Sequence, residues 1–328
     1  MLKLKYLFHD VNLAEMLVKN WEYDPESLDM FEYYRISSNA IYPFEYEEQT
    51  RLLRFAPTTE KCRANIAAEL EFIAYLRGKG YGALEPVASL GGEELVEART
   101  PWGDFYASVF KRVPGVQISQ TDCSDEIMFC YGQALGKLHQ LSSEYVPSTA
   151  KRWSCLDVLT WIEELFSDSA QEEAAALAEA ELLRKYFASL PVTKSNFGLV
   201  HYDFEYDNVF YDETTHSCHV IDFDDAMYHW YAMDIEQALA SLQGCVSPDS
   251  FNSTKQCFLD GYRSEFAIPD DLETLLPACR RFAALYGYAR VWRAMAEQWA
   301  NEPDWLVELR ENLIEHLDED SSCFGKEL

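Results

Sequence analysis

The chain has 328 residues, of which 48% are hydrophobic and 14% aromatic, and its formal net charge is −29 at pH 7. Nucleic acids and anionic membrane surfaces are bound through clustered lysine and arginine, so this composition argues against both partner classes. The same negative charge favours a small cationic partner, although it also serves solubility. At about 150 residues per domain, the length predicts two domains.

The sequence contains no apolar run near the roughly 20 residues that span a membrane. Its nine cysteines include no C-x-x-C pair, a pattern typical of reduced thiols in a cytoplasmic protein, and we expect that location. The segment 216–219 (HSCH) has the composition of a metal site. It lies between two short apolar runs, however, and we interpret it as a hairpin turn.

The N-terminal third shows strand signals and one helix. Aromatic and β-branched runs predict strands at 31–36, 40–44, 50–55 and 105–110. Ile66, Leu70 and Ile73 recur at helical spacing before a glycine stop, which predicts a helix between the third and fourth of these runs. Gly91-Gly92 is typical of a hairpin turn between two further strands. The break at 111–115 (KRVPG) suggests a hinge, and we divide the chain into domains 1–112 and 113–328.

The remainder of the chain is mostly helical. Ile127, Tyr131, Ala134 and Leu138 fall on one helix face, and glycines at 132 and 136 permit close packing. Further helices are predicted at 155–167, 170–189, 231–243, 250–266 and 271–317. Short strands at 197–200, 208–211 and 219–223 interrupt them. A mainly β part followed by a mainly α part with one β island is an α+β fold.

Two segments carry the chemistry. The first, 201–208 (HYDFEYDN), has the pattern H-x-D-x(4)-N, and the second, 220–225 (VIDFDD), is an apolar strand that ends in aspartates. Phosphoryl transfer uses one carboxylate to orient the attacking hydroxyl, and an amide with a second carboxylate to hold Mg²⁺ on the nucleotide. Clustered carboxylates repel one another by about 4 kcal/mol per pair at 4 Å, which favours a divalent cation.

These segments resemble the aminoglycoside phosphotransferase and choline kinase family, and the similarity extends over most of the chain. The resemblance implies a protein-kinase-like, two-lobed fold. It also implies that Asp203 is the catalytic base and that Asn208 and Asp222 bind Mg²⁺. By the same resemblance, His201 and Asp234 hold the catalytic loop in place.

The resemblance extends to the N-terminal lobe, which would bind the nucleotide. Arg54 stands where the family has a basic residue for the phosphates, with Glu69 as its helix partner, and the hinge around Val113 would face adenine. The phosphate loop Ser37-Ser38-Asn39 lacks the pattern G-x-G-x-x-G, so both ATP and GTP stay open as donors.

The substrate side is less defined by the sequence. Trp230 follows the metal segment directly and is a hypothetical substrate contact, while Glu205 and Asp207 are loop-surface or substrate-facing acids. Asp224 and Asp225 have three open roles, namely a second metal, the substrate or a helix cap.

The sequence thus predicts an ATP- and Mg²⁺-dependent phosphotransferase that acts on a hydroxyl of a small molecule. Aminoglycosides, choline or ethanolamine, homoserine and sugar-like metabolites are the candidate acceptors. The alternative is a nucleotide-binding or spore-coat-associated protein that kept the fold and lost turnover. A protein kinase is disfavoured because no D-F-G or A-P-E segment is present. A metal-dependent phosphatase would leave H-x-D-x(4)-N unexplained.

Overall fold

The computed structural model describes residues 1–148, 151–244, 246–268 and 272–326, which form two compact units. The first unit contains Met1–Thr121, Val146–Lys151 and Asp207–Asp224, and the second contains Asp122–Tyr145, Arg152–Tyr206 and Asp225–Leu328. The prediction divided the chain at a single point, after residue 112. Grouping by contact additionally places 113–121, 146–151 and 207–224 in the first unit.

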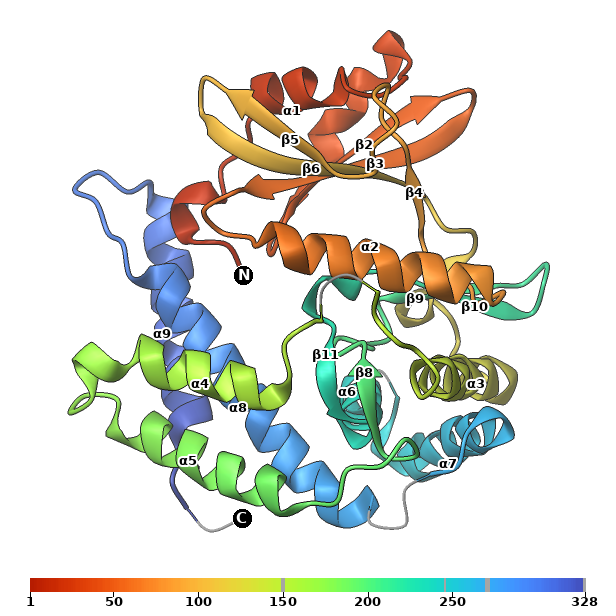
Figure 1. The fold of residues 1–328 in the computed structure, drawn as a ribbon, viewed down its shortest axis with the longest axis vertical. Helices are drawn as coiled ribbons and strands as arrows, with labels where there is room; N and C mark the ends of the chain where they lie inside the picture. The colour runs from red at the N-terminus through yellow and green to blue at the C-terminus, as the bar shows by residue number, and fades with distance from the viewer. Residues whose placement is uncertain (149–150, 245, 269–271, 327–328) are drawn as a thin grey trace. The chain divides into compact units, whose positions relative to one another are not determined.

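A six-stranded antiparallel sheet forms the centre of the first unit (Figure 1). Its strands are β1 (Arg35–Ile36), β2 (Ala40–Tyr46), β3 (Gln49–Pro57), β4 (Glu85–Val87), β5 (Val96–Thr100) and β6 (Gly103–Lys111). The order is β1-β2-β3-β6-β4, and β5 also pairs with β6. The predicted strands at 40–44, 50–55 and 105–110 are confirmed as β2, β3 and β6. These inner strands are also the most apolar, as burial on both faces requires.

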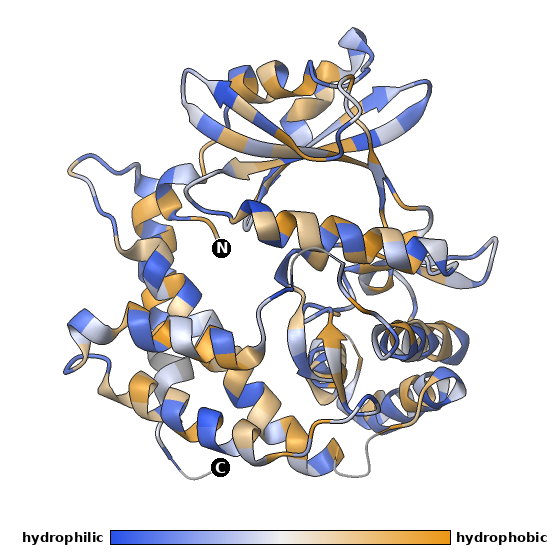
Figure 2. Cartoon of the chain, in the orientation of Figure 1, coloured by the Kyte–Doolittle hydropathy of each residue, from blue (hydrophilic) through white to orange (hydrophobic). Residues whose placement is uncertain are grey.

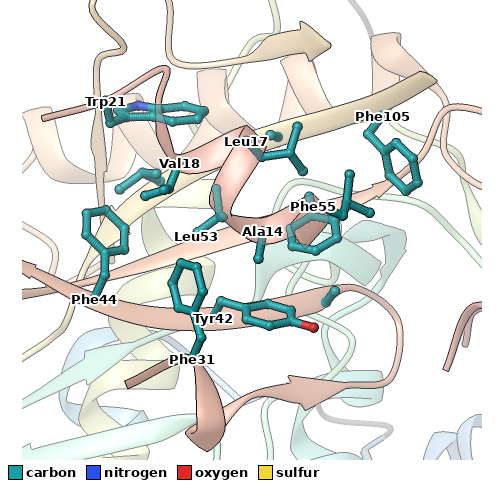
Figure 3. Close-up of a cluster of buried hydrophobic side chains, with 14 residues drawn as sticks. Ala14, Leu17, Val18, Trp21, Phe31, Tyr42, Phe44, Leu53, Phe55 and Phe105 are labelled. Carbon is teal, nitrogen blue, oxygen red and sulfur yellow. The ribbon is translucent and has the colours of Figure 1, made fainter. Parts of the chain in front are cut away.

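The two faces of this sheet have different partners. Tyr42, Leu53 and Val109 stand directly opposite one another on adjacent strands and are fully buried. They pack against helix α1 (Val11–Val18) and the 3₁₀ helix η2 (Pro25–Tyr33), and Figure 3 shows the aromatic rings of this cluster interleaved with the α1 side chains. Because side chains alternate along a strand, the neighbouring residues Arg54 and Ser108 point to the other face.

Helix α2 (Arg63–Gly78) covers that second face, across the sheet from α1 (Figure 1). Ile66, Leu70 and Ile73 are buried, as their spacing predicts. The helix ends at Gly78, and Gly80 then takes a φ of 79°, a conformation that L side chains rarely adopt.

Two predictions in the first unit are wrong. Residues 31–33 belong to η2 rather than to a strand, because Pro25 and the Asp24 cap start a helical segment that carries Phe31 into the core beside Tyr42. Gly91-Gly92 does not join a hairpin. The strands on either side of it, β4 and β5, both pair with the long strand β6, at different positions along it.

A smaller sheet completes the first unit, with the order β10-β9-β7. Its strands are β7 (Val116–Gln117), β9 (Val209–Asp212) and β10 (Ser217–Val220). The predicted hairpin is confirmed, since β9 and β10 are antiparallel neighbours, but its turn lies at 213–216. Of the segment 216–219, only His216, with a φ of 50°, belongs to the turn, and residues 217–219 are part of β10. Strand β10 ends at Val220, three residues earlier than predicted, because the 3₁₀ turn η5 (Phe223–Asp225) follows it.

In the second unit, α3 (Asp125–Ser142) packs against α7 (Pro248–Glu265) at unusually short range. A Cβ atom added to Gly132 would lie 1.8 Å from the carbonyl oxygen of Phe258, and one added to Gly136 would lie 2.4 Å from that of Tyr262. Gly261 of α7 faces α3 in the same way, because a Cβ atom added to it would lie 2.0 Å from the carbonyl oxygen of Phe129. The predicted close packing is confirmed, and it depends on glycine because only a residue without Cβ fits.

We therefore expect Gly132→Ala to lower the free energy of unfolding by about 1–3 kcal/mol, because the two helices must separate to admit the methyl group. Gly287→Ala is the matched control, since Gly287 lies in a helix with nothing within 4 Å of its added Cβ. That change should raise stability by about 0.5–1 kcal/mol through helix propensity. Urea unfolding of both variants measures the difference, and equal stabilities would contradict the packing described.

The other elements of the second unit surround a two-stranded sheet in which β8 (Phe197–Val200) pairs with β11 (Met227–Trp230). The remaining helices are α4 (Cys155–Leu165), α5 (Ala174–Ser189), α6 (Ala232–Gln243), α8 (Leu272–Met295) and α9 (Asp304–Ser321). Short 3₁₀ turns occur at Leu4–Tyr6, Ile118–Gln120 and Ser167–Ser169. Figure 2 shows hydrophobic and hydrophilic residues alternating around these helices, which is typical of helices that bury one face. None of the helices in the described ranges has the length and hydropathy of a membrane span.

The single helix predicted at 271–317 is wrong in one respect. Residue 271 lies outside the described residues, and the helical run is broken at 296–303 into α8 and α9. Pro303 stands directly before α9, where a proline is tolerated because the first N–H groups of a helix have no partner within it, and it disfavours the helical conformation in the residue before it. The apolar periodicity continues across the gap, so periodicity alone did not reveal it.

Candidate active site

The first unit contains a cavity of about 220 Å³ with an apolar part and a polar part. The apolar walls are Ile41, Leu52, Leu84, Phe110, Phe210 and Ile221. The polar lining includes Arg35, Ser37, Ser38, Asn39, Arg54, Asn208 and Asp222. The segment Lys111–Val113, at the end of β6, lines it as well. A ligand that combines a flat heterocycle with a charged group would match both the apolar and the polar side chains of this lining.

Seven residues singled out in the sequence meet on this cavity, although they are up to 185 positions apart. They are Ser37, Ser38, Asn39, Arg54, Val113, Asn208 and Asp222. The loop 37–39 is the tight turn between β1 and β2, in which the Ser37 N–H donates to the carbonyl oxygen of Asn39 at 3.0 Å. This turn presents small polar side chains to the cavity without any glycine. The roles of the seven residues stay predictions.

Arg54 and Glu69 form a buried two-point ion pair. Nη1 donates to Oε1 at 2.7 Å and Nη2 to Oε2 at 2.9 Å, while the residues are only 8% and 1% exposed. Burial by itself lowers the pKa of Arg54, but the carboxylates of Glu69, Asp224 and Asp222 raise it further than burial lowers it. Arg54 therefore stays charged, and Glu69 fixes where its charge points. Glu71 turns away, as predicted, and accepts a hydrogen bond from the Ser148 N–H.

In the second unit, Asp234 at the start of α6 holds the segment that contains Asp203. Its carboxylate accepts hydrogen bonds from the backbone N–H groups of His201, at 2.8 Å, and Tyr202, at 2.6 Å. The Asp203 N–H donates to Nδ1 of His201 at 3.2 Å, so the ring of His201 supports the backbone of Asp203. His201 and Asp234 are both fully buried. This geometry agrees with the positioning roles that the resemblance implied for them.

His139 is a member of this network that sequence reasoning missed. Its Nε2 lies 3.0 Å from Oδ2 of Asp234, and its Nδ1 lies 2.8 Å from the hydroxyl of Tyr262. Burial lowers the pKa of His139, with Asp234 opposing the effect in part. A neutral imidazole can donate from Nε2 to Asp234 and accept from the tyrosine. The signal in the sequence was a histidine on the buried face of a predicted helix, which by itself indicates only packing.

Tyr202, directly before Asp203, has a φ of 72°, which is uncommon for a residue other than glycine. Its backbone is fixed on both sides, because the carbonyl oxygen also accepts from Nε2 of Gln237 at 2.9 Å. Its ring packs edge-on against Phe282 and Tyr286. Burial is the main cause that raises the pKa of Tyr202, so the phenol stays neutral. These contacts hold the strained turn that presents Asp203.

The two aspartates whose roles the sequence left open are both paired with cations of the chain. Within the first unit, Asp224 contacts Nζ of Lys61 and accepts from Nδ2 of Asn39 at 3.1 Å. Within the second unit, Asp225 accepts from Nη1 of Arg290 at 2.7 Å. Lys61 had no signal in the sequence beyond its charge. Neither carboxylate is therefore available as an uncompensated metal ligand.

The structure corrects one substrate prediction. Trp230 is 2% exposed and packs against Phe187 and Phe197, so it belongs to the interior of the second unit. Glu205 and Asp207 are half-buried. The carbonyl oxygen of Asp207 accepts from Nε2 of Gln117 at 2.6 Å. Its Oδ1 is buried and has no hydrogen-bond partner among the described residues.

The sequence profile of the phosphotransferase enzyme family matches residues 36–253, which is more than half of the chain. The chain belongs to this family. The resemblance read from the motifs is thereby confirmed, and both the loop at 201–208 and the aspartates at 222–225 fall within the matched region.

Individual proteins resemble this chain either in sequence or in fold. The amicoumacin kinase of Bacillus subtilis (strain 168) is 25% identical over 240 residues, which are 71% of this chain and 68% of that protein. The solved structure of amicoumacin kinase hAmiN, in complex with AMP-PNP, Ca²⁺ and Ami, superposes with a TM-score of 0.75 at 19% identity and covers 96% of this chain and 95% of its own. A microcompartment-associated aminopropanol kinase gives 0.70 at 20% identity, with 95% of each chain covered. The two-lobed, kinase-like fold predicted from the sequence is confirmed.

Proposed function

We propose that this protein is a kinase that transfers the terminal phosphate of ATP, with Mg²⁺, to a hydroxyl of a small amino alcohol. The observation that carries the proposal is the meeting of the loop 37–39, Arg54, Asn208 and Asp222 on one cavity. Family membership supports phosphoryl transfer as the reaction. The solved complex of amicoumacin kinase hAmiN with AMP-PNP supports a nucleotide donor.

The cavity suits a nucleotide in both of its parts. The apolar side chains of Ile41, Leu52 and Phe110 would enclose the base, and the backbone at Val113 would offer it hydrogen bonds. At the polar end, Arg54 and the hydroxyls of the loop 37–39 would bind the phosphates. Arg54 is suited to this task because Glu69 holds its planar group in one orientation.

Asn208 and Asp222 fit a magnesium ion by the chemistry of their donor atoms. Mg²⁺ prefers oxygen ligands and is usually held by one or two carboxylates together with substrate phosphates and water. An amide oxygen and a carboxylate on the same cavity supply that set. Asp222 follows β10 with a φ of 64°, which is uncommon for a residue other than glycine, and it lines the cavity. When bound, the ion would neutralise charge on the phosphates.

Asp203 is the proposed base. As the acceptor oxygen forms its bond to the terminal phosphorus, the bond from phosphorus to the ADP oxygen breaks, and the hydroxyl proton passes to the Asp203 carboxylate. The hydrogen bonds of Asp234 to the backbone on the N-terminal side of Asp203 restrict the position of that carboxylate. A base held in place in this way needs little reorganisation during the reaction.

The acceptor that we propose is a cationic amino alcohol. The solved structure of an aminopropanol kinase with a similar fold supports this class. The net charge of −29 also favours the approach of a cation. We further propose a cytoplasmic location, where ATP is available. The free cysteines of the described residues, eight in all, are consistent with a reducing compartment.

Calorimetric titration with ATP and with GTP, each with and without Mg²⁺, tests the donor and the metal together. We expect wild-type protein to bind ATP more tightly with Mg²⁺, and Asp222→Ala to lose that enhancement because a ligand of the ion is gone. Glu213→Ala is the control, since Glu213 is an exposed acid of the same unit. A screen of amino alcohols by ADP release then identifies the acceptor.

The outcome also separates the proposal from its alternative. If neither nucleotide binds wild-type protein at millimolar concentration, the protein is a member of the family that lost turnover. The glycine-free loop 37–39 is the feature that would account for such a loss. Preference for GTP over ATP would correct the donor and leave the chemistry in place.

A further inference from the structure

Lys61 lies between β3 and α2 in the first unit, and its Nζ forms an ion pair with Oδ2 of Asp224. The same oxygen accepts a hydrogen bond from Nδ2 of Asn39 at 3.1 Å. The pair is shielded, since the side chains of Lys61 and Asp224 are only 18% and 8% exposed. Among the described residues, Asp224 is the sole ion-pair partner of Lys61.

This ion pair adjoins the polar end of the cavity described above. Asn39 and Arg54 line that cavity, and they also line the small neighbouring cavity to which Asp224 belongs. Asp222, two positions before Asp224, lines the main cavity itself. The ammonium group of Lys61 is thus separated by one carboxylate from the residues proposed to meet the phosphates and the metal.

We propose that Lys61 binds the terminal phosphate of the donor nucleotide, and that Asp224 holds it beside the cavity until the nucleotide arrives. This inference rests on the proposed function. The ammonium group of Lys61 would exchange Oδ2 of Asp224 for an oxygen of the terminal phosphate, so its positive charge has an anionic partner in both positions. Asp224 keeps its hydrogen bond from Asn39 after Lys61 has moved.

The chemistry of lysine suits such an exchange. Lysine is a compact charge on a flexible four-carbon chain with three donors, so it can turn between neighbouring anions without movement of the backbone. Arg54 lacks this freedom, because two of its nitrogens are committed to Glu69. Lys61 can therefore move to contact the terminal phosphate, whereas Arg54 is held in one position by Glu69.

A contact with the terminal phosphate predicts selectivity between nucleotides, because only the triphosphate carries that group. Calorimetry with ATP and with ADP, each with Mg²⁺, measures it directly without turnover. We expect Lys61→Met to weaken ATP binding by about tenfold or more, as for a lost hydrogen bond to a charged group, and to leave ADP binding nearly unchanged. Lys19→Met, a change at an exposed lysine of the same unit, should alter neither.

A purely structural role for Lys61 gives a different pattern. In that case its removal would weaken ATP and ADP equally, or not at all, because only the position of Asp224 would change. Asp224→Asn and the double variant Lys61→Met/Asp224→Asn separate the two roles, since the double variant leaves no unpaired carboxylate. We expect the double variant to bind ATP more weakly than Asp224→Asn does, and both variants to bind ADP equally well.

Loss of that selective effect in the Asp224→Asn background would overturn the proposal, as would equal losses for the two nucleotides in Lys61→Met. A wild-type protein that binds neither nucleotide is a distinct result. It would refute the proposed function itself, and the role of Lys61 with it. Thermal unfolding of each variant shows whether a change in binding comes from a loss of folded protein.

Discussion

Asp203→Asn should lower kcat for phosphate transfer by about 10²–10⁴-fold, the range for loss of a general base. Asparagine has the shape of aspartate but cannot take the proton of the acceptor hydroxyl. Binding of ATP with Mg²⁺ should stay unchanged, because Asp203 is not among the residues that line the cavity proposed for the nucleotide. ADP release with an accepted amino alcohol measures kcat, and calorimetry measures nucleotide binding.

The matched control for this variant is Glu205→Gln, which removes a carboxylate two positions away in the same loop. The network that Asp234 makes with His201 and Tyr202 uses backbone N–H groups and does not involve the side chain of residue 203, so the loop should keep its form in Asp203→Asn. A kcat within twofold of the wild-type value would show that another group takes the proton. A similar loss in both variants would point to the charge of the loop rather than to one base.

Glu69→Gln should lower the free energy of unfolding by about 3–5 kcal/mol, because it leaves the buried Arg54 charge without its carboxylate. Nucleotide binding should fall as well, since the guanidinium loses the partner that orients it. Urea unfolding measures the first effect and calorimetry the second. Glu71→Gln is the control, because Glu71 is a half-buried glutamate of the same helix that accepts a hydrogen bond from the Ser148 N–H and points away from Arg54.

The double variant Arg54→Met/Glu69→Leu distinguishes stability from function. Replacing both members of a buried ion pair with apolar residues of similar size is often neutral or stabilising. We therefore expect this variant to recover the stability that Glu69→Gln loses, and still to bind ATP poorly. Recovery of both properties would contradict the phosphate-binding role of Arg54.

Local patterns in the sequence were sufficient where a residue's neighbours along the chain decide its structure. Runs of aromatic, β-branched and apolar residues were enough to predict β2, β3 and β6, and the spacing of Ile66, Leu70 and Ile73 follows from burial of one helix face. The glycines at 132 and 136 predicted a close approach that the α3–α7 contact requires. Such patterns missed the 3₁₀ segment at 31–33, the pairing of β4 and β5 and the break after α8.

The residues of the candidate site were predicted because their types and spacing along the chain are unusual together. The pattern H-x-D-x(4)-N and the following aspartates needed no knowledge of packing. Trp230 was misplaced because an aromatic residue near a site and one in the core have the same local signal, and only burial tells them apart. Lys61 was missed because its partner Asp224 is 163 positions away.

By itself, then, the sequence determined the fold class, the family and the loop that carries the proposed base, since each depends on residue type and local spacing. Only the tertiary structure decided which charges are compensated. It paired Asp224 with Lys61 and Asp225 with Arg290, and it placed His139 beside Asp234. These pairings depend on which distant segments share a buried space, because removing a charge from water is costly unless a partner is in reach.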